Sequence, residues 1–407
     1  MSYAVAMFSV HTSPLDLPGR TKDAGGMNVY MRELAQALAE RNVCIDIFTR
    51  WTNEQTPQVI QLNSKIRVVH VKAGPLAPVR KHDLYRYLPA FVRSVEAFRK
   101  RETRSYDLVH SHYWLSGVVA SQLARQWDVP HIIMFHTLAR LKQLANPAEA
   151  EPPLRLVMEQ KLIQQADRII AATADERLQM IRHYGATPHR VAVIPCGVDL
   201  QRFVPQAKQQ ARAHLGLSLQ QPLLLFAGRL DPFKGPDVLL RAASMMEEPA
   251  QVLIVGGKPG EDEERLKLQQ LAEQLDIRQR VHFLDARPQQ ELPLIYSAAD
   301  VTVVPSYHEI FGLVAAESLA CGTPVVATRA GGLATIVRHG ETGFLVPRCP
   351  GFFAEKLDAL LRDEELYASM QAACRASVLH FSWQNVAASV HSLYDELICD
   401  ASCMAAR

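Results

Sequence analysis

The stretch that decides the fold runs from Val301 to Glu317 and reads VTVVPSYHEIFGLVAAE. It begins with a β-branched run typical of a buried strand, continues through a short polar loop, and changes to helical spacing of its apolar residues. A strand that leads through a polar loop into a helix is half of a βαβ unit. Open α/β sheets bind their ligands at the carboxyl ends of strands, so this loop is predicted to carry part of a ligand site.

The same order of strand and helix repeats along most of the chain. Before residue 198, β-branched runs followed by helical segments occur at Ala4–His11, Cys44–Thr49, Ile66–Val71, Leu108–His112, His131–His136, Arg168–Ala172 and Val191–Pro195. After residue 221 they occur at Leu223–Ala227, Val252–Val255, Val281–Leu284, Val301–Pro305, Val325–Ala327 and Phe344–Val346. Strands that alternate with helices predict a parallel sheet with helices on both faces. The sequence therefore predicts two α/β, Rossmann-like domains in tandem.

The alternation of strands and helices is interrupted between about residues 198 and 221, which contain Pro205 and glutamine-rich patches. We therefore expect a first domain over residues 1–200 and a second over residues 201–381. Residues 382–407 contain a last amphipathic helix that could pack back on the first domain.

Composition narrows the choice of partners. With 44 Lys and Arg against 42 Asp and Glu, the formal charge is only +2, which gives no broad positive field for a nucleic acid or an anionic membrane. No apolar stretch is long enough to span a bilayer, and no basic segment precedes the run from Ala4 to Val10, so we expect a cytoplasmic protein that does not contact the membrane. The expected partners are small molecules.

Two cations in the second domain suit a diphosphate. The loop Gly228–Gly235, GRLDPFKG, follows a predicted strand and carries Arg229 and Lys234 five residues apart. A guanidinium and an ammonium can share the charge of a diphosphate at this edge of a sheet. Because the chain contains no Asp-x-Asp, a site for a divalent metal is not expected. The glycine pattern G-x-G-x-x-G is also missing after the strands, which argues against a nicotinamide dehydrogenase.

Two carboxylates are predicted to lie at the same edge of the sheet in the second domain. Glu309 stands at the predicted corner between strand and helix, where it can accept hydrogen bonds from sugar hydroxyls. Glu317 is predicted to lie about two turns into a largely buried helix, near enough to reach a ribose. The backbone amides from Phe311 onward would face an anion.

The first domain contributes glycines and histidines. Gly25-Gly26 at a predicted helix start would let a phosphate approach the backbone. His110 and His112 share one face of their strand, but no third carboxylate accompanies them, so a metal site is disfavoured. His136, at the carboxyl end of a strand, is a better functional candidate than a core histidine.

Together these motifs resemble those of the retaining GT-B glycosyltransferases of family 4 over nearly the whole chain. The resemblance rests on Gly25-Gly26, His136, Arg229 with Lys234, Glu309 to Glu317, Ala320 to Ala327 and Gly331-Gly332. It implies two Rossmann-like domains that face each other across a cleft. It also implies a hexosyltransferase that uses a UDP-sugar as substrate and requires no metal or other cofactor.

The resemblance also assigns roles to residues. The donor would be held by Gly25, Gly26, Arg229, Lys234, Phe311, Gly312, Leu313, Val314 and Glu317, with the uracil near Leu284 to Arg287. His136 and Glu309 would form the catalytic centre by contacting the transferred sugar. Neither would be needed as a covalent nucleophile, because an acceptor hydroxyl on the same face of the sugar could lose its proton to the departing phosphate. Preorganised cations and amides would stabilise the charge that develops on UDP.

The acceptor is expected to be phosphorylated. Positions that match the phosphate pocket of the inositol-phosphate enzymes in the family are Lys81, Tyr113, Thr137 and Arg155, and Asn28 is also assigned to the acceptor. Two cations and two hydroxyls would suit a dianion. Arg155 begins a predicted helix, where a cation opposes the helix dipole, so a bound anion would explain it.

Two subfamilies compete for the acceptor. The segments GGMNVY at 25–30, HSHYWLSG at 110–117 and HTL at 136–138 look like the mycothiol enzymes that move N-acetylglucosamine from UDP to inositol phosphate. The pattern of Gly19, Arg20, Asp23, Gly25 and Gly26 is similar to the donor loop of sucrose-phosphate synthases. The glutamine-rich composition favours the second, so sucrose biosynthesis from UDP-glucose and fructose 6-phosphate is our main prediction. The inositol-phosphate enzyme is the alternative, and a nucleotide-sugar epimerase is less favoured.

Overall fold

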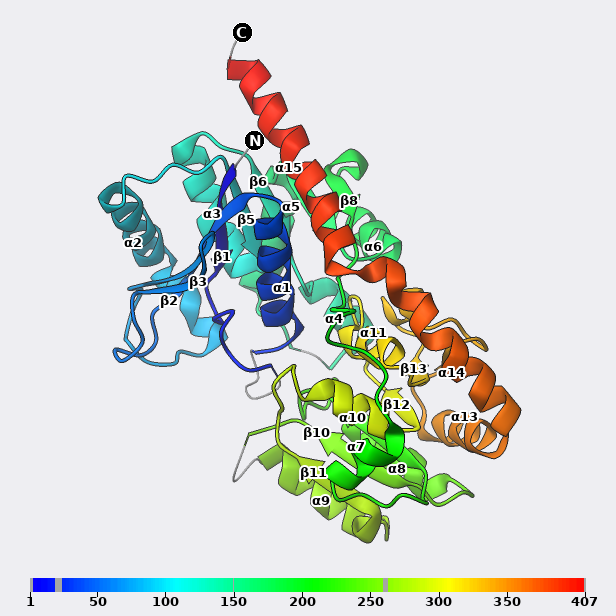
Figure 1. Ribbon diagram of the computed structural model, residues 1–407. Helices are drawn as coiled ribbons and strands as arrows, with labels where there is room; N and C mark the ends of the chain where they lie inside the picture. The colour runs from blue at the N-terminus through cyan, green and yellow to red at the C-terminus, as the bar shows by residue number, and fades with distance from the viewer. Residues whose placement is uncertain (1–2, 19–23, 149, 259–262, 406–407) are drawn as a thin grey trace. The chain divides into compact units, whose positions relative to one another are not determined.

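The computed structural model describes residues 3–18, 24–148, 150–258 and 263–405, and the side chains as far as residue 400 (Figure 1). The chain forms two compact units. Unit 1 comprises Met1–Asp16, Met27–Pro195 and Trp383–Arg407, and unit 2 comprises Leu17–Gly26 and Cys196–Ser382. The divisions at 195/196 and 382/383 stand beside the boundaries expected after residues 200 and 381.

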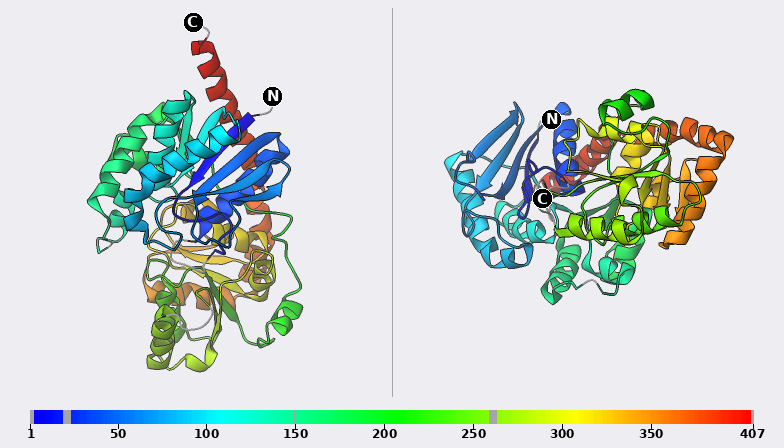
Figure 2. Two further views of the ribbon diagram at one scale, coloured as in Figure 1. Left: turned by 90° about the vertical axis from the view of Figure 1, so that its left-hand side faces the viewer. Right: turned by 90° about the horizontal axis from the view of Figure 1, so that it is seen from below.

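Unit 1 is built on an eight-stranded sheet in the order β3-β4-β2-β1-β5-β6-β7-β8. Its strands are β1 (Tyr3–Ser9), β2 (Val43–Arg50), β3 (Val59–Asn63), β4 (Ile66–Val71), β5 (Leu108–His112), β6 (His131–Met134), β7 (Arg168–Ala171) and β8 (Val191–Val193). Its α-helices are α1 (Gly26–Glu40), α2 (Leu88–Arg101), α3 (Trp114–Trp127), α4 (Ala139–Ala145), α5 (Pro153–Gln165), α6 (Ala174–Tyr184) and α15 (Trp383–Ala405). A 3₁₀ helix, η1, spans Lys81–Tyr87. Helices α2 and α3 cover one face of the sheet, and α1 and α15 the other (Figures 1 and 2).

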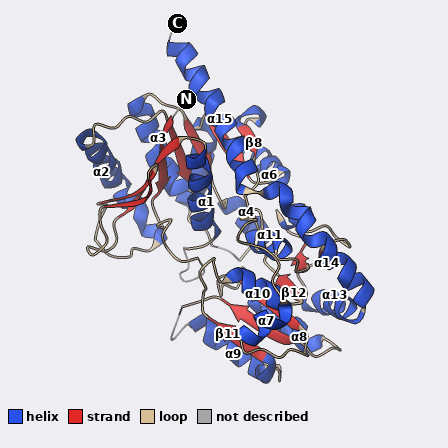
Figure 3. Ribbon diagram, viewed as in Figure 1, coloured by secondary structure: helices blue, strands red, loops and turns tan. Residues whose placement is uncertain are grey.

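Unit 2 is built on a six-stranded parallel sheet in the order β11-β10-β9-β12-β13-β14. The strands are β9 (Leu223–Ala227), β10 (Gln251–Val255), β11 (Val281–Leu284), β12 (Val301–Val304), β13 (Val325–Thr328) and β14 (Gly343–Val346). The α-helices are α7 (Lys208–His214), α8 (Pro236–Met245), α9 (Glu263–Gln274), α10 (Leu292–Ala298), α11 (Leu313–Ala320), α12 (Leu333–Ile336), α13 (Pro350–Arg362) and α14 (Glu364–Val378). In chain order this is the 3-2-1-4-5-6 arrangement of doubly wound sheets. Figure 3 shows the strands of each unit between helices.

The central strands are buried on both faces, as parallel strands usually are. Every residue of β5 and β12 is buried. In unit 1 the core packs Phe8, Phe48 and Phe91 between the sheet and α2, and in unit 2 it packs Val303 and Phe353 between the sheet and α13. The predicted α/β class is therefore confirmed, and continuous β-branched runs were a reliable signal for these strands.

One strand departs from the expected parallel sheet. Strand β3, which the sequence did not reveal, pairs with β4 in antiparallel fashion at the edge of unit 1. No residue of β3 is buried, and a register shift occurs between Gln61 and Asn63. An exposed edge strand needs no apolar run, so its sequence resembles a loop.

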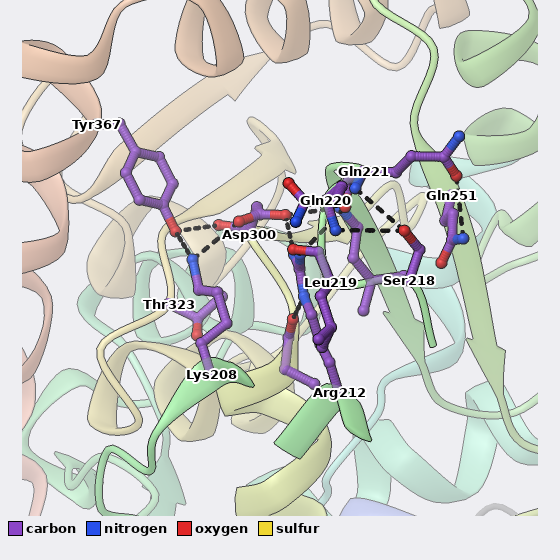
Figure 4. Close-up of polar contacts among 12 residues, drawn as sticks. Lys208, Arg212, Ser218, Leu219, Gln220, Gln221, Gln251, Asp300, Thr323 and Tyr367 are labelled. Carbon is purple, nitrogen blue, oxygen red and sulfur yellow. Dashed lines mark hydrogen bonds and ion pairs between the residues drawn. The ribbon is translucent and has the colours of Figure 1, made fainter. Parts of the chain in front are cut away.

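The segment expected to be a linker contains a helix that is anchored to unit 2. Asp300, just before β12, accepts hydrogen bonds from Lys208 Nζ (2.8 Å) and from Arg212 of α7. The same carboxylate accepts the Leu223 backbone N–H at 2.6 Å, and Lys208 also donates to the Tyr367 hydroxyl at 2.7 Å (Figure 4). The polar residues between 198 and 221 therefore belong to unit 2, where partly buried charge pairs replace an apolar stripe.

The C-terminal helix α15 belongs to unit 1. The Tyr394 hydroxyl lies 2.7 Å from His110 Nδ1, and the Trp383 ring packs edge-on against Tyr30 of α1 at 5.5 Å. The last turns of α15 extend past the rest of this unit (Figures 1 and 2). Among the described residues, no helix is long and apolar enough to cross a membrane.

Candidate active site

Two loops of unit 2 meet at the point where the strand order reverses. The loop Gly228–Gly235 follows β9, and the loop that begins at Pro305 follows the neighbouring strand β12. The Tyr307 backbone N–H donates to the Phe233 carbonyl at 2.9 Å, so the two loops are joined directly. This is the position at which doubly wound sheets bind ligands.

Gly235 and Arg348 hold these loops together. Gly235 has a φ of 76°, and a Cβ at this position would lie 2.4 Å from the Pro305 carbonyl oxygen. Arg348 donates to the Pro305 carbonyl from Nε at 2.9 Å and to the Pro232 carbonyl at 3.3 Å, and its guanidinium lies 3.6 Å from the centroid of the Tyr307 ring. Sequence reasoning missed Arg348, although its place after β14 puts it at the same edge of the sheet.

Lys234 and Glu309 form an ion pair across the two loops. Lys234 Nζ lies 2.6 Å from Glu309 Oε1, which also accepts a hydrogen bond from Ser306 Oγ at 2.8 Å. Burial alone would raise the pKa of Glu309, but the Lys234 ammonium and these hydrogen bonds lower it below its usual value. Glu309 is therefore an ionised carboxylate. Its second oxygen, Oε2, can accept a hydrogen bond from a sugar hydroxyl.

Arg229 lies in the same loop as Lys234. Its guanidinium is 3.9 Å from the Asp231 carboxylate, and its side chain is 31% exposed. Both predicted diphosphate-binding cations are thus placed at the carboxyl edge of the sheet in unit 2.

Helix α11 starts beside Glu309 and presents its first amides at the same edge. Gly312 caps it with a φ of 101°, and the helix begins at Leu313. The N–H groups of a first helical turn have no acceptor within the helix, and they carry the positive end of the helix dipole. Phe311, Gly312, Leu313 and Val314 therefore lie where an anion could receive backbone hydrogen bonds.

Glu317 is buried but paired. It lies one turn into α11, not the expected two, because the helix begins at Leu313. The Tyr296 hydroxyl donates to Oε2 at 2.8 Å, and Gln289 Nε2 donates to Oε1 at 3.2 Å. These partners, which sequence reasoning missed, offset the cost of burying a carboxylate that is 5% exposed.

Gly331-Gly332 fits closely against the loop that carries Glu309. The Gly332 backbone N–H donates to the Glu309 carbonyl at 2.7 Å. A Cβ on Gly332 would lie 2.3 Å from the Ile310 carbonyl oxygen. The second glycine pair therefore shapes the loop through close backbone contact.

In unit 1, four of the predicted acceptor residues are connected through the Tyr113 ring and the Arg155 guanidinium. Lys81 Nζ lies 5.8 Å from the centroid of the Tyr113 ring, and the guanidinium of Arg155 lies 4.9 Å from it. Arg155 also donates to the Thr137 carbonyl at 2.8 Å and to the Thr137 hydroxyl at 2.9 Å. Residues from η1, α5 and the loops after β5 and β6 are thus brought together.

Arg155 differs from the sequence expectation in its partners. Its side chain is 2% exposed and pairs with Glu159 at 2.6 Å and with Glu151 at 2.8 Å. Glu159 in turn accepts hydrogen bonds from the Tyr184 hydroxyl at 2.6 Å and the Ala139 backbone N–H at 2.9 Å. Two carboxylates therefore account for a cation at the start of α5, and no bound anion is needed to explain it.

Asn28 and the first glycine pair lie at the start of α1. Asn28 is fully buried, and its amide donates to Thr12 Oγ1 at 2.8 Å and to the Ser13 carbonyl at 2.5 Å. Gly26 is the first residue of the helix. A Cβ at Gly25 would meet no heavy atom of the described residues within 4 Å. Gly19, Arg20 and Asp23, on which the likeness to the sucrose-phosphate donor loop depends, lie outside the described residues.

Two residues at the ends of adjacent strands have unusual backbone angles. Tyr113, after β5, has a φ of 75°, and His136, after β6, has a φ of 58°. Residues other than glycine seldom adopt a positive φ, and those that do are often found at functional sites. Both residues were predicted to contact substrates.

His136 is neutral and bonded to a second histidine. Its Nε2 lies 2.9 Å from His112 Nδ1. Burial, with the nearby His110 and His11, lowers the pKa of His136 to about 3. An imidazole that stays neutral at physiological pH can direct a hydrogen bond without adding charge.

Both halves of the chain match family models. Residues 24–202 match the model described as Glycosyltransferase Family 4, and residues 207–377 match the model described as Glycosyl transferases group 1.

Curated relatives match over most of their length. The D-inositol 3-phosphate glycosyltransferase of Corynebacterium jeikeium is 43% identical over 405 residues, which cover 97% of this chain and 96% of the relative. The protein of the same name from Thermomonospora curvata is 48% identical over 378 residues, covering 88% and 87%.

Solved structures share the fold. Sucrose-phosphate synthase from Thermosynechococcus elongatus superposes with a TM-score of 0.92 at 34% identity, covering 98% of this chain and 100% of that one. Anabaena Alr3699/HepE in complex with UDP and glucose superposes with a TM-score of 0.76 at 20% identity, covering 97% and 100%. The chain belongs to the family 4 glycosyltransferases and has the GT-B fold.

Proposed function

We propose that this glycosyltransferase moves N-acetylglucosamine from UDP-N-acetylglucosamine to D-inositol 3-phosphate with retention of configuration. The observation that carries the proposal is that Lys81 and Arg155 both lie against the Tyr113 ring and that Arg155 donates to the Thr137 hydroxyl, which brings together the residues predicted to hold the acceptor phosphate. The Lys81 ammonium and the Thr137 hydroxyl would suit a phosphate dianion, and Arg155, which its two carboxylates already pair, would hold Thr137 in place.

The relatives also support this acceptor. Those 43% and 48% identical are named for D-inositol 3-phosphate, whereas the sucrose-phosphate synthase structure is 34% identical. Glutamine-rich composition had favoured sucrose-phosphate synthesis, but composition reports little about a binding site. The inositol-phosphate alternative is therefore the better-supported function.

The geometry of unit 2 suits a mechanism without a covalent protein nucleophile. Glu309 is paired with Lys234, and this pair would orient the transferred sugar through Oε2. Arg229, Lys234 and the first amides of α11 would stabilise the negative charge on departing UDP. The acceptor hydroxyl would give its proton to the phosphate oxygen that this departure exposes.

A substrate matrix tests the proposal. UDP-N-acetylglucosamine and UDP-glucose would each be incubated with D-inositol 3-phosphate, fructose 6-phosphate and no acceptor, and UDP release and product mass would be measured. We expect the main product from UDP-N-acetylglucosamine and inositol phosphate. Sucrose 6-phosphate as the main product would support the other subfamily, and turnover without an acceptor would support an epimerase.

We also expect the reaction to proceed in excess EDTA. Arg229 and Lys234 would supply the positive charge that a divalent cation could otherwise provide at a diphosphate. Initial rates would be compared before and after chelation, and again after addition of magnesium or manganese. Loss of activity that either metal restores would contradict the metal-free mechanism.

A further inference from the structure

A buried histidine stands behind His136 in unit 1. His112, the last residue of β5, is fully buried, and its Nδ1 lies 2.9 Å from Nε2 of the half-buried His136. Exactly one hydrogen can lie between these two nitrogens when both rings are neutral. Which ring carries it determines whether Nδ1 of His136 can donate a hydrogen bond to a ligand or only accept one.

The other nitrogen of His112 indicates where that hydrogen lies. Nε2 of His112 is buried and has no hydrogen-bond partner among the described residues. Its ring packs against His110 at 4.4 Å and against Tyr30 at 5.7 Å between centroids. A buried N–H group without an acceptor is rarer and more costly than a buried lone pair without a donor. The hydrogen of His112 therefore belongs on Nδ1.

This assignment fixes the tautomer of His136. With its hydrogen on Nδ1, His112 donates to Nε2 of His136, so His136 must carry its own hydrogen on Nδ1. The Tyr30 ring packs edge-on against His136 at 5.1 Å and limits rotation of the imidazole. The backbone at His136, with its φ of 58°, is likewise held away from the usual conformations.

We propose that His112 is a positioning residue that fixes His136 in the Nδ1–H tautomer, so that His136 offers the transferred sugar a hydrogen-bond donor and not a lone pair. The proposal rests on the proposed function only in placing His136 at the sugar. It predicts that His136 orients a sugar oxygen and does not act as a general base.

The tautomer can be observed without substrate. In full-length protein labelled with ¹⁵N-histidine, NMR of the wild type should show His136 protonated on Nδ1, with its signals assigned from the His136→Ala variant. His112→Asp, which puts an acceptor in place of the donor, should place a hydrogen on Nε2 of His136. His112→Asn should retain the wild-type form, because the amide Nδ2 of asparagine stands near the place of histidine Nδ1 and also donates.

Kinetics separate positioning from a general loss of packing. We expect His112→Leu to lower kcat about tenfold, the value of roughly one neutral hydrogen bond, with little change in KM for the donor. His112→Asn should recover most of that loss. His131→Leu is the matched control, because His131 is also buried and neutral but bonds to Ser111. It should lower stability and leave the tautomer of His136 unchanged.

A double variant decides whether His112 acts through His136. If it does, His112→Leu should cost nothing further in the His136→Ala background. An unchanged His136 tautomer in His112→Asp, or the same loss of kcat from His112→Leu in both backgrounds, would overturn the proposal. Full turnover of His136→Ala would instead overturn the placement of His136 at the sugar, and the NMR result would distinguish the two failures.

Discussion

Replacement of Lys234 by alanine is expected to lower turnover by about a hundredfold or more, the usual cost of removing one preorganised group that stabilises a developing anion. Lys234 should affect the reaction in two ways, because it is predicted to bind the diphosphate and its ammonium also holds Glu309 at 2.6 Å. Without it, burial raises the pKa of Glu309, and the carboxylate loses the partner that orients it. The measurement is kcat with saturating donor and acceptor.

Lys208 provides a matched control for this substitution. Its ammonium lies 2.8 Å from Asp300, and its side chain is 30% exposed against 23% for Lys234 (Figure 4). The two ion pairs therefore have similar geometry within the same unit, but the Lys208 pair anchors α7. Lys208→Ala should lower the melting temperature and leave kcat close to the wild-type value. Equal losses of kcat in both variants would show that Lys234 acts through stability alone.

The extent to which sequence predicted this fold depended on burial. Strands such as β5 and β12 are buried on both faces, so their apolar runs were visible in the sequence. Strand β3 is exposed at an edge, and α7 is held by charges from Asp300, so neither required an apolar pattern. The sequence signal reports the apolar core, and it is weak where polar contacts determine the structure.

In the candidate site, too, the sequence identified residues but not the polar contacts between them. Lys234 and Glu309 were both identified from the loops that carry them, but the sequence did not show that they pair across those loops. Arg155 was also identified, and a bound anion was expected to explain a cation at the start of a helix. The structure shows that the carboxylates of Glu151 and Glu159 pair with it instead. Residue type and position after a strand indicated that these residues lie at the carboxyl ends of strands, whereas their partners depended on tertiary contacts.

The acceptor pocket leads to the second large expected effect. We expect kcat/KM for D-inositol 3-phosphate to exceed that for inositol by about 10⁴, because a site built for a polar group strongly rejects an analogue that lacks it. Without the phosphate, the ammonium of Lys81 beside Tyr113 and the hydroxyl of Thr137 beside Arg155 would lose the anion that they are predicted to bind. Initial rates with both acceptors at fixed donor concentration measure this ratio.

Lys81 is the residue at which to test that discrimination. Lys81→Met keeps the apolar stem and removes the charge, so KM for the phosphorylated acceptor should rise about tenfold or more, in line with roughly 1.5–3 kcal/mol for a charge-assisted contact. Turnover of unphosphorylated inositol and affinity for UDP should hardly change. Arg155 is unsuitable for this test, because its removal would leave Glu159 buried without its cation and cost about 3–5 kcal/mol of stability.

Lys72 offers the control for Lys81. Its ammonium lies 5.7 Å from the centroid of the Trp51 ring, as that of Lys81 lies 5.8 Å from the Tyr113 ring, so Lys72→Met removes a similar contact elsewhere in unit 1. It should leave the preference between the two acceptors unchanged. If Lys81→Met also left that preference unchanged, Lys81 would not contact the phosphate, and the positive charge that selects the acceptor would have to come from another residue.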